Sequence, residues 1–165
     1  MRNHYRLLIV EDESDLADSL KDLLSEDYSR VDVAKNGQVA LEMMVAQPYH
    51  LVIADVVMPV MSGHEFLRQL RLKGVHTPLI FMTGNGTKDL VQSAIKLGAV
   101  DFIDKPISIE TLKEIVEATL QIEQHKRNIS DLQRDPHPDS ELIRNEQLAL
   151  GIKQVSRDKL LKRQE

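Results

Sequence analysis

The sequence predicts an α/β fold in which helices cover both faces of a five-stranded parallel sheet, giving three layers. Short apolar runs alternate five times with segments whose apolar residues recur at helical spacing. The apolar runs are continuous rather than interleaved with polar residues, which is typical of parallel strands that are buried on both faces. Right-handed crossovers then produce a three-layer sandwich, for which the expected strand order is 2-1-3-4-5.

The first two strand–helix units occupy the beginning of the chain. Leu7–Val10 is expected to form the first buried strand, and leucines recur at helical spacing through Ser14–Asp27. Val31–Ala34 is the second expected strand. Asn36 and Gly37 then turn the chain into a second helix, whose methionines are expected to fill the core.

Three further units follow the same pattern. Their strands are expected at Leu51–Ala54, Leu79–Met82 and Val100–Ile103. Their helices are expected at Glu65–Lys73, at Thr87–Leu97 and from Ile109 onward. Gly74 and Gly98 can end the first two of these helices, and Ser108 can cap the third. The inward-facing residues of the middle helix are expected to be Leu90, Ala94, Ile95 and Leu97.

The character of the chain changes after about Thr119, where polar residues dominate. We therefore divide it into a folded domain over residues 1–121 and a helical extension over residues 122–165. The last helix is expected to reach Arg134, before the prolines of Asp135–Pro138 interrupt it. Its apolar stripe is formed by Ile115, Ile122, Ile129 and Leu132. This stripe predicts either a short coiled coil in a homodimer, a solvated helix end, or a link to an output domain outside this sequence.

Several classes of protein are disfavoured by composition. Cysteine is absent, which leaves no disulfide framework. The apolar runs are too short to span a bilayer, and we expect a cytoplasmic protein that does not act in a membrane. The net charge of −5 and an aromatic content of 4% argue against direct binding of nucleic acid. No segment resembles a helix-turn-helix with a basic recognition helix.

Charged and hydroxyl side chains follow four of the expected strands. Glu11 and Asp12 follow the first strand, Asp55 the third, Thr83 the fourth, and Lys105 comes after the fifth. The carboxyl ends of parallel strands meet at one edge of the sheet, so three carboxylates are expected to crowd together there. Carboxylates at close range require a cation, and all-oxygen ligands suit Mg²⁺. With a hydroxyl and a lysine, such a cluster can support phosphoryl transfer to a carboxylate nucleophile.

Four motifs make a specific resemblance at this point. The motifs are Ile9–Glu13, Asp55–Gly63, Met82–Gly84 and Gly98–Pro106. In this order, each following an expected strand, they resemble the receiver domains of response regulators in two-component signalling. The resemblance covers roughly Tyr5 to Gln121 and implies a flavodoxin-like sandwich.

The resemblance implies a role for each motif residue. Asp55 is expected to be the phosphorylated nucleophile, and Asp12, Asp55 and the backbone carbonyl of Val57 to ligate Mg²⁺, with Glu11 assisting through a water. Thr83 and Lys105 are expected to contact phosphoryl oxygens. Phe102 stands at the position of the switch aromatic, and a cis Lys105–Pro106 bond is expected.

The sequence departs from the commonest receiver pattern in three places. Glu11 replaces an aspartate, which lengthens its reach to the metal. Phe102 has no hydroxyl with which to report its movement. Val57 presents an apolar side chain next to the acceptor, and we expect it to hinder the attacking water and slow loss of the phosphoryl group.

Each site residue also has an ordinary structural interpretation. The acids after the first strand could favour a helix dipole, and Asp55 could simply stabilise an Asx-turn. Thr83 could cap a loop, and Lys105 could be a solvated lysine. Four such coincidences at one edge of a sheet are improbable. Phe102 is expected to be partly packed in the core whether or not it switches.

The predicted function is a phosphoacceptor receiver that switches its partner-binding surface. As the resemblance implies, the donor is a sensor histidine kinase or a histidine phosphotransfer protein. Such a domain catalyses its own phosphorylation and dephosphorylation but is not a turnover enzyme on external substrates. One alternative is a phosphorylation-independent scaffold of the same fold. Another is a haloacid dehalogenase-type hydrolase, but this class carries a second aspartate where this chain has Val57, and no cap domain is visible.

Overall fold

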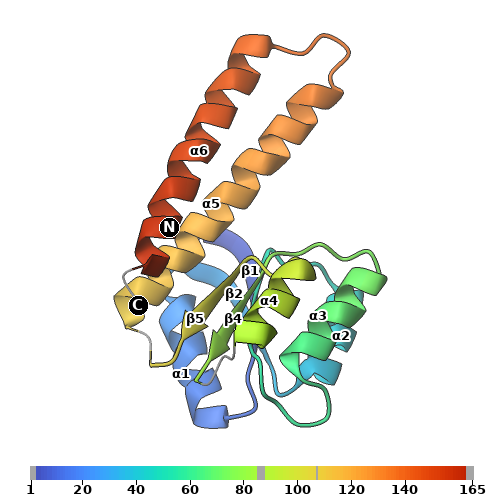
Figure 1. Cartoon of the computed structure of the whole chain (residues 1–165), viewed down its shortest axis with the longest axis vertical. Helices are drawn as coiled ribbons and strands as arrows, with labels where there is room; N and C mark the ends of the chain where they lie inside the picture. The colour runs from blue at the N-terminus through green and yellow to red at the C-terminus, as the bar shows by residue number, and fades with distance from the viewer. Residues whose placement is uncertain (1–2, 85–87, 107, 163–165) are drawn as a thin grey trace. The chain divides into compact units, whose positions relative to one another are not determined.

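The computed structural model describes residues 3–84, 88–106 and 108–162 (Figure 1). The chain divides into two compact units, residues 1–107 and residues 108–165. The first unit contains all five strands, and the second contains the last two helices. Among the described helices, none is both long enough and apolar enough to cross a membrane.

The first unit alternates strands and helices as predicted. Its strands are β1 (Asn3–Val10), β2 (Tyr28–Ala34), β3 (Leu51–Asp55), β4 (Leu79–Thr83) and β5 (Asp101–Asp104). Its helices are α1 (Ser14–Ser25), α2 (Gly37–Ala46), α3 (Gly63–Leu72) and α4 (Lys88–Lys96). Local signals explain where two of the helices begin, because Asn36 accepts a hydrogen bond from the Val39 N–H and Ser62 accepts one from the Glu65 N–H.

The five strands form one parallel sheet in the order β2-β1-β3-β4-β5, which confirms the predicted topology. β1 pairs with β2 on one side and with β3 on the other. The register aligns Val10 with Ala54, so Glu11 and Asp55 come next at the same edge of the sheet. The topology therefore brings the ends of β1 and β3 together.

Both faces of the sheet are buried. One face supplies Leu8, Val10, Val52, Ala54, Leu79 and Phe81 to a hydrophobic core that also includes residues from α2, α3 and α4. Residues of the opposite face, such as Leu7, Ile9 and Ile53, are equally inaccessible. α1 contacts β1 and β2, and its buried residues lie outside that core. This arrangement confirms the three-layer, flavodoxin-like fold and explains why the strands are apolar throughout.

The second unit is a helical hairpin made by α5 (Ile109–Arg134) and α6 (Ser140–Lys162), which run antiparallel in Figure 1. Ser108 caps α5, as predicted, by accepting a hydrogen bond from the Thr111 N–H. α5 and α6 are joined by polar contacts of Glu146, which lies 2.6 Å from His125 Nδ1 and accepts a hydrogen bond from Asn128 Nδ2 at 3.3 Å.

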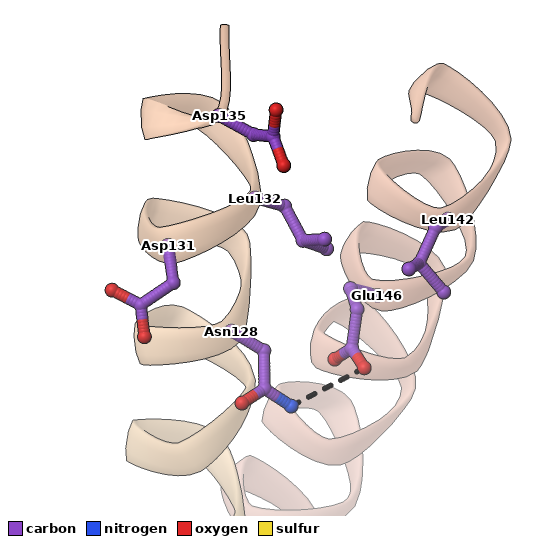
Figure 2. A pocket seen from close by; sticks show the side chains of 6 residues that line it. All are labelled: Asn128, Asp131, Leu132, Asp135, Leu142 and Glu146. Atoms are coloured by element: carbon purple, nitrogen blue, oxygen red, sulfur yellow. Dashed lines mark hydrogen bonds between the residues drawn. The ribbon is translucent and has the colours of Figure 1, made fainter. Parts of the chain in front are cut away.

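A pocket of about 410 Å³ opens between the two helices, near the turn that joins them. In Figure 2, Leu132 of α5 extends toward α6, and the Asn128–Glu146 bond lies one turn earlier in α5, farther from the joining turn. The remaining lining residues are Asp131, Asp135 and Leu142. This part of the hairpin is therefore acidic and only loosely packed.

The apolar stripe predicted for the extension is largely covered within the chain. Ile115 and Ile122 are buried, and Ile129 and Leu132 are half-buried. The structure thus contains an intramolecular helix pair in the segment for which a coiled coil between two chains is one of the three expectations. Because α5 continues without a break past residue 121, no change in secondary structure marks the predicted domain boundary.

Several element details differ from the predictions. β1 and β2 begin earlier than expected, at Asn3 and Tyr28, because polar residues at their starts take part in the strand ladder. α3 begins at Gly63 rather than at Glu65, since Ser62 supplies the cap. Ile95 was expected to face inward, and this is wrong: it is exposed on α4, whereas Ala94 is buried. Thr87 and the side chain of Leu90 lie outside the described residues.

Candidate functional site

The site begins with two acidic residues that follow β1. The Glu11 N–H donates to the Ala34 carbonyl oxygen at 3.0 Å, which extends the β1–β2 ladder by one residue. The Glu11 side chain is buried, whereas that of Asp12 is exposed. This contrast follows from the period of a strand, because successive side chains point to opposite sides. One carboxylate therefore lies inside the sheet edge and the other at its surface.

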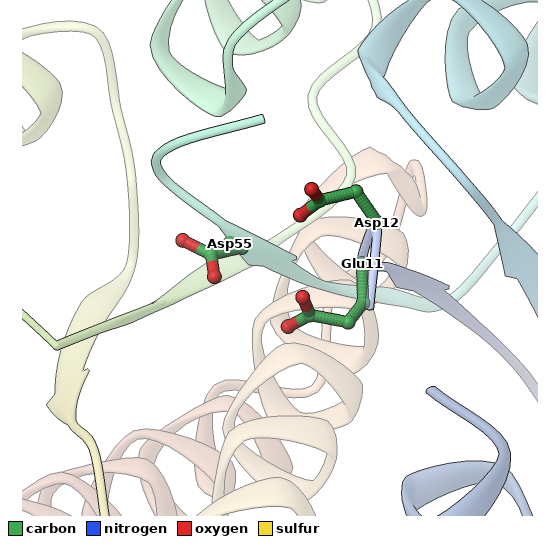
Figure 3. A group of neighbouring side chains, drawn as sticks. All are labelled: Glu11, Asp12 and Asp55. Carbon is green, nitrogen blue, oxygen red and sulfur yellow. The ribbon is translucent and has the colours of Figure 1, made fainter. Parts of the chain in front are cut away.

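Asp55 is the last residue of β3 and completes an acidic cluster. Glu11, Asp12 and Asp55 each place a carboxylate oxygen within 4.8 Å of those of the other two. Figure 3 shows Glu11 and Asp12 extending from the end of β1 toward the side of the sheet where Asp55 stands. The predicted convergence of acids from the first and third strands is therefore present.

Lys105 reaches into this cluster from the segment after β5. Its Nζ lies 2.5 Å from Asp55 Oδ2 and 2.9 Å from Glu11 Oε2. Burial on its own lowers the pKa of this amine, but the hydrogen bonds to Asp55 and Glu11 outweigh burial, so the pKa of Lys105 is raised. The lysine is therefore held as a cation between two carboxylates.

Backbone N–H groups hold the second oxygen of each of these carboxylates. The Val57 N–H donates to Asp55 Oδ1 at 3.0 Å, and the Glu13 N–H donates to Glu11 Oε1 at 3.3 Å. Asp55 thus does stabilise a local turn, as one of the structural alternatives supposed, but the same carboxylate also contacts Lys105. Both side chains are fixed in orientation before any ligand arrives. The Val57 side chain itself is 71% exposed.

Thr83 and Phe102 lie at the neighbouring strands. Thr83 is buried at the end of β4, and its carbonyl accepts a hydrogen bond from the Lys105 N–H at 2.8 Å. Met82, the residue before it, pairs with Asp55 in the β3–β4 register. Phe102 on β5 is half-buried, and its ring centroid lies 5.2 Å from that of Phe81. It is therefore partly packed against the core, as predicted.

The loop after β3 is tightly constrained. A Cβ added to Gly63 would lie 2.2 Å from the Asp55 carbonyl oxygen and 2.7 Å from the Phe81 ring, so only glycine fits there. Val60 has a φ of 69°, a conformation that is unusual for a β-branched residue. Sequence reasoning missed both constraints, although Gly63 was quoted as part of the motif. The cis Lys105–Pro106 bond is present, as predicted.

The donor set of this cluster fits a hard divalent cation. Three ionised carboxylates and one lysine cation would give these four side chains a net charge of −2. The atoms that this cluster offers to a cation are all carboxylate oxygens. The exposure of Asp12 leaves room for the water ligands that Mg²⁺ retains. Within the residues that the structure describes, no other group of three acidic, histidine or cysteine side chains converges in this way.

Comparison with known protein families gives a direct match. Residues 7–117 match the response regulator receiver domain. The chain belongs to this family. Receiver domains of response regulators accept phosphoryl groups from histidine kinases and bind Mg²⁺ at an acidic pocket, and this receiver has an acidic cluster of Glu11, Asp12 and Asp55.

Curated relatives agree with this assignment. The receiver is 40% identical over 121 residues to the two-component response regulator ORR41 of Oryza sativa subsp. japonica, a match that covers 70% of this chain and 94% of that protein. It is 36% identical over 140 residues to a probable cyclic di-GMP phosphodiesterase of Vibrio cholerae serotype O1, covering 84% of this chain but 31% of that protein. The chain spans about half or less of several of the curated relatives it matches.

Solved structures share the receiver fold. The chemotaxis protein CheY4 of Vibrio cholerae superposes with a TM-score of 0.66 at 27% identity, covering 71% of this chain and 99% of that one. NtrX from Brucella abortus gives a TM-score of 0.73 at 28% identity, covering 79% of this chain and 30% of that one. These relatives favour a two-component receiver over the dehalogenase-type hydrolase and the phosphorylation-independent scaffold.

Proposed function

We propose that this receiver is switched by phosphorylation of Asp55. The observation that carries the proposal is the position of the Asp55 carboxylate, which lies between a lysine cation and two further acids at the end of β3. In the reaction, an Asp55 carboxylate oxygen forms a bond to phosphorus as the phosphorus–nitrogen bond of a donor phosphohistidine breaks, and the donor imidazole leaves with the electron pair. The product is an aspartyl phosphate.

Lys105 and Thr83 are proposed to hold the transferred group. The Lys105 ammonium already contacts the Asp55 carboxylate. After the transfer it can donate to a phosphoryl oxygen instead of the carboxylate oxygen. Thr83 is positioned to join it, since its carbonyl accepts from the Lys105 N–H and its neighbour Met82 pairs with Asp55. A backbone hydrogen bond therefore links Lys105 and Thr83.

The same cluster is proposed to bind Mg²⁺ during the reaction. Asp12, Asp55 and the backbone carbonyl of Val57 would ligate the ion directly, with Glu11 assisting through a water. A bound Mg²⁺ supplies positive charge that offsets the charge on the transferring phosphoryl oxygens.

Phe102 is proposed to transmit the effect of phosphorylation from the site to the protein surface. Phosphorylation adds about two negative charges at the sheet edge, and movement of Thr83 toward them would open space near β4 and β5. The Phe102 ring is half-buried against Phe81, so it can turn further inward when that space appears. The surface around β5 and α4 would then differ between the two states.

We also propose that this chain acts within a longer signalling protein or beside a separate effector. The match to the Vibrio cholerae phosphodiesterase covers 84% of this chain, which is longer than the receiver match, so wherever it begins it must include part of the helical extension. That likeness favours the interpretation of α5 and α6 as a connection to an output domain, with an enzymatic output as one candidate. The receiver itself is proposed to catalyse only its own phosphorylation and dephosphorylation.

The test is phosphorylation of the purified full chain with acetyl phosphate, with and without Mg²⁺, read by intact mass. We expect one added phosphoryl group that depends on Mg²⁺ and is absent from Asp55→Asn. Asp12→Asn should slow the reaction strongly, whereas Glu13→Gln, which changes an acid outside the three-carboxylate cluster, should not. Equal phosphorylation of Asp55→Asn and wild type would refute the assignment, and sustained hydrolysis of p-nitrophenyl phosphate would indicate the hydrolase alternative.

A further inference from the structure

The outer face of α6 carries apolar side chains that no other part of the described chain covers. Leu148, Ile152 and Val155 are 66%, 59% and 56% exposed. They are separated by four and three residues, so they lie on one side of the helix, which we call the outer stripe. A shallow hollow of about 520 Å³ runs along it, lined also by Gly151 and Lys159. The other side of α6, including Ile143 and Leu150, is half-buried.

Gly151 lies beside the outer stripe, in the middle of α6. Glycine at such a position costs a helix roughly 0.5–1 kcal/mol relative to alanine. A Cβ placed on Gly151 would meet nothing within 4 Å, and its backbone does not have a positive φ. Among the described residues, therefore, no contact and no backbone conformation requires glycine there. The close approach of a helix from a second molecule would explain why glycine occupies position 151.

The outer stripe is the centre of a longer heptad pattern. The a and d positions of this pattern are Glu141, Asn145, Leu148, Ile152, Val155, Lys159 and Lys162, with alternating separations of four and three residues. The apolar residues occupy the middle. The two ends carry opposite charge, since Glu141 is in the first turn of α6 and the lysines are in its last turns. Such a pattern selects the direction in which a second copy of the helix can pair.

Only one relative direction of two paired α6 helices brings opposite charges together. In a parallel pair, Glu141 and Lys159 would each face their own copy, which brings like charges together. In an antiparallel pair the a positions of one helix face the d positions of the other, so Leu148 faces the partner's Ile152 and Glu141 faces the partner's Lys159. The flanking positions agree, because Arg144 then lies opposite the partner's Asp158, and Gly151 opposite the partner's Gly151.

We propose that two copies of this chain associate through the outer stripes of their α6 helices, as a two-fold symmetric antiparallel pair. The occupant of the stripe is thus a second copy of the chain, and the two-fold axis passes near Gly151. The association does not depend on phosphorylation of Asp55. It uses the face of α6 opposite to the half-buried one, and differs from the dimer predicted from the α5 stripe.

The first experiment measures the association of the full chain by analytical ultracentrifugation over a concentration series. Wild type should show a reversible monomer–dimer equilibrium, and Asp55→Asn should share it. Ile152→Glu places a charge in the middle of the apolar stripe of each copy and should weaken association by about tenfold or more. Gln133→Glu adds the same charge at the exposed end of α5, outside the hollow along the stripe, and should leave association unchanged. A wild type that remains monomeric at its highest soluble concentration would overturn the proposal.

A charge exchange tests the direction of pairing. Arg144→Asp and Asp158→Arg should each weaken the dimer several-fold, because each leaves like charges opposed across the interface. The double variant restores opposite charges only in the antiparallel arrangement and should recover wild-type association. Both single changes agree with the α6 dipole, so a weaker dimer cannot be attributed to a lost helix. A double variant as weak as the singles would exclude this pairing.

Discussion

Lys105 joins Asp55 to Glu11, with its Nζ 2.5 Å from the first carboxylate and 2.9 Å from the second. This lysine therefore offsets part of the charge in the acidic cluster when no cation is bound. Lys105→Met removes that charge and should lower the free energy of unfolding by about 1–3 kcal/mol in the absence of metal. Mg²⁺ should then restore more stability to the variant than it adds to wild type, because the carboxylates have lost their counter-charge.

Urea unfolding with and without Mg²⁺ measures both effects of the Lys105 substitution. Lys105→Arg keeps the charge at this position and serves as the matched control, with a smaller loss expected. If Mg²⁺ stabilises Lys105→Met and wild type by the same amount, the lysine does not compete electrostatically with the cation.

Val57 bears on the lifetime of the phosphorylated state. Its side chain, two residues past Asp55, is 71% exposed and offers no group that can orient a water. Val57→Asn supplies such a group and should speed loss of the phosphoryl group several-fold. The measurement is the decay of the phosphorylated protein, followed by intact mass after the donor is removed. Val57→Leu remains apolar and should decay at or below the wild-type rate; an asparagine variant no faster than wild type would contradict the role.

Gly63 is expected to be intolerant of any side chain. A Cβ there would lie 2.2 Å from the Asp55 carbonyl oxygen, which is backbone and cannot turn aside. Gly63→Ala should therefore lower the free energy of unfolding by about 1–3 kcal/mol or more. Gly84→Ala is the matched control, because a Cβ at Gly84 meets nothing within 4 Å and should change stability by no more than about 0.5 kcal/mol. Urea midpoints would decide, and equal effects of the two substitutions would contradict the close approach.

Much of the arrangement of residues at the edge of the sheet could be predicted, because the pattern of apolar residues and the strand order determine it. Continuous apolar strands require a sheet covered on both faces, and this requirement places Asp12 and Asp55 at one edge before any distance is known. The contact of Lys105 with Asp55 is consistent with the same reasoning, since β5 ends at that edge as well.

Details that depend on tertiary contacts could not be predicted in the same way. Ile95 fits an amphipathic helix pattern, yet it is exposed, because helical spacing alone does not say how wide the buried face is. The α5 stripe is covered within the chain, although the same periodicity would suit a partner chain. The positive φ of Val60 has no sequence signal, since valine is among the residues least suited to it.

Val60 should be a site where a simple substitution stabilises the protein. It has a φ of 69° and is 83% exposed, so its side chain gains little from packing while its backbone is strained. Asparagine tolerates this conformation better, and Val60→Asn should raise the free energy of unfolding by up to about 1 kcal/mol. The same substitution at Val57, which does not share the positive φ, should not stabilise the protein. A midpoint of urea unfolding that is unchanged or lower in Val60→Asn would contradict the strain.

Glu65 gives the fold a defined response to acid. Hydrogen bonds from Arg68, and then from Gln69, lower the pKa of Glu65 from 4.5 to about 2. A carboxylate with a lowered pKa in the folded state contributes stability above its unfolded pKa, and loses that contribution as the pH falls through its folded pKa. Glu65→Gln should therefore be less stable than wild type at neutral pH, by a small amount because the pair is exposed. This difference should shrink between about pH 4.5 and pH 2, and urea midpoints at a series of pH values would measure it. In an Arg68→Gln background the pH dependence should be weaker, since the Arg68 hydrogen bond that lowers the pKa of Glu65 most is gone. If Glu65→Gln and wild type differ in stability at pH 2 as much as at neutral pH, Glu65 is not the source of the difference.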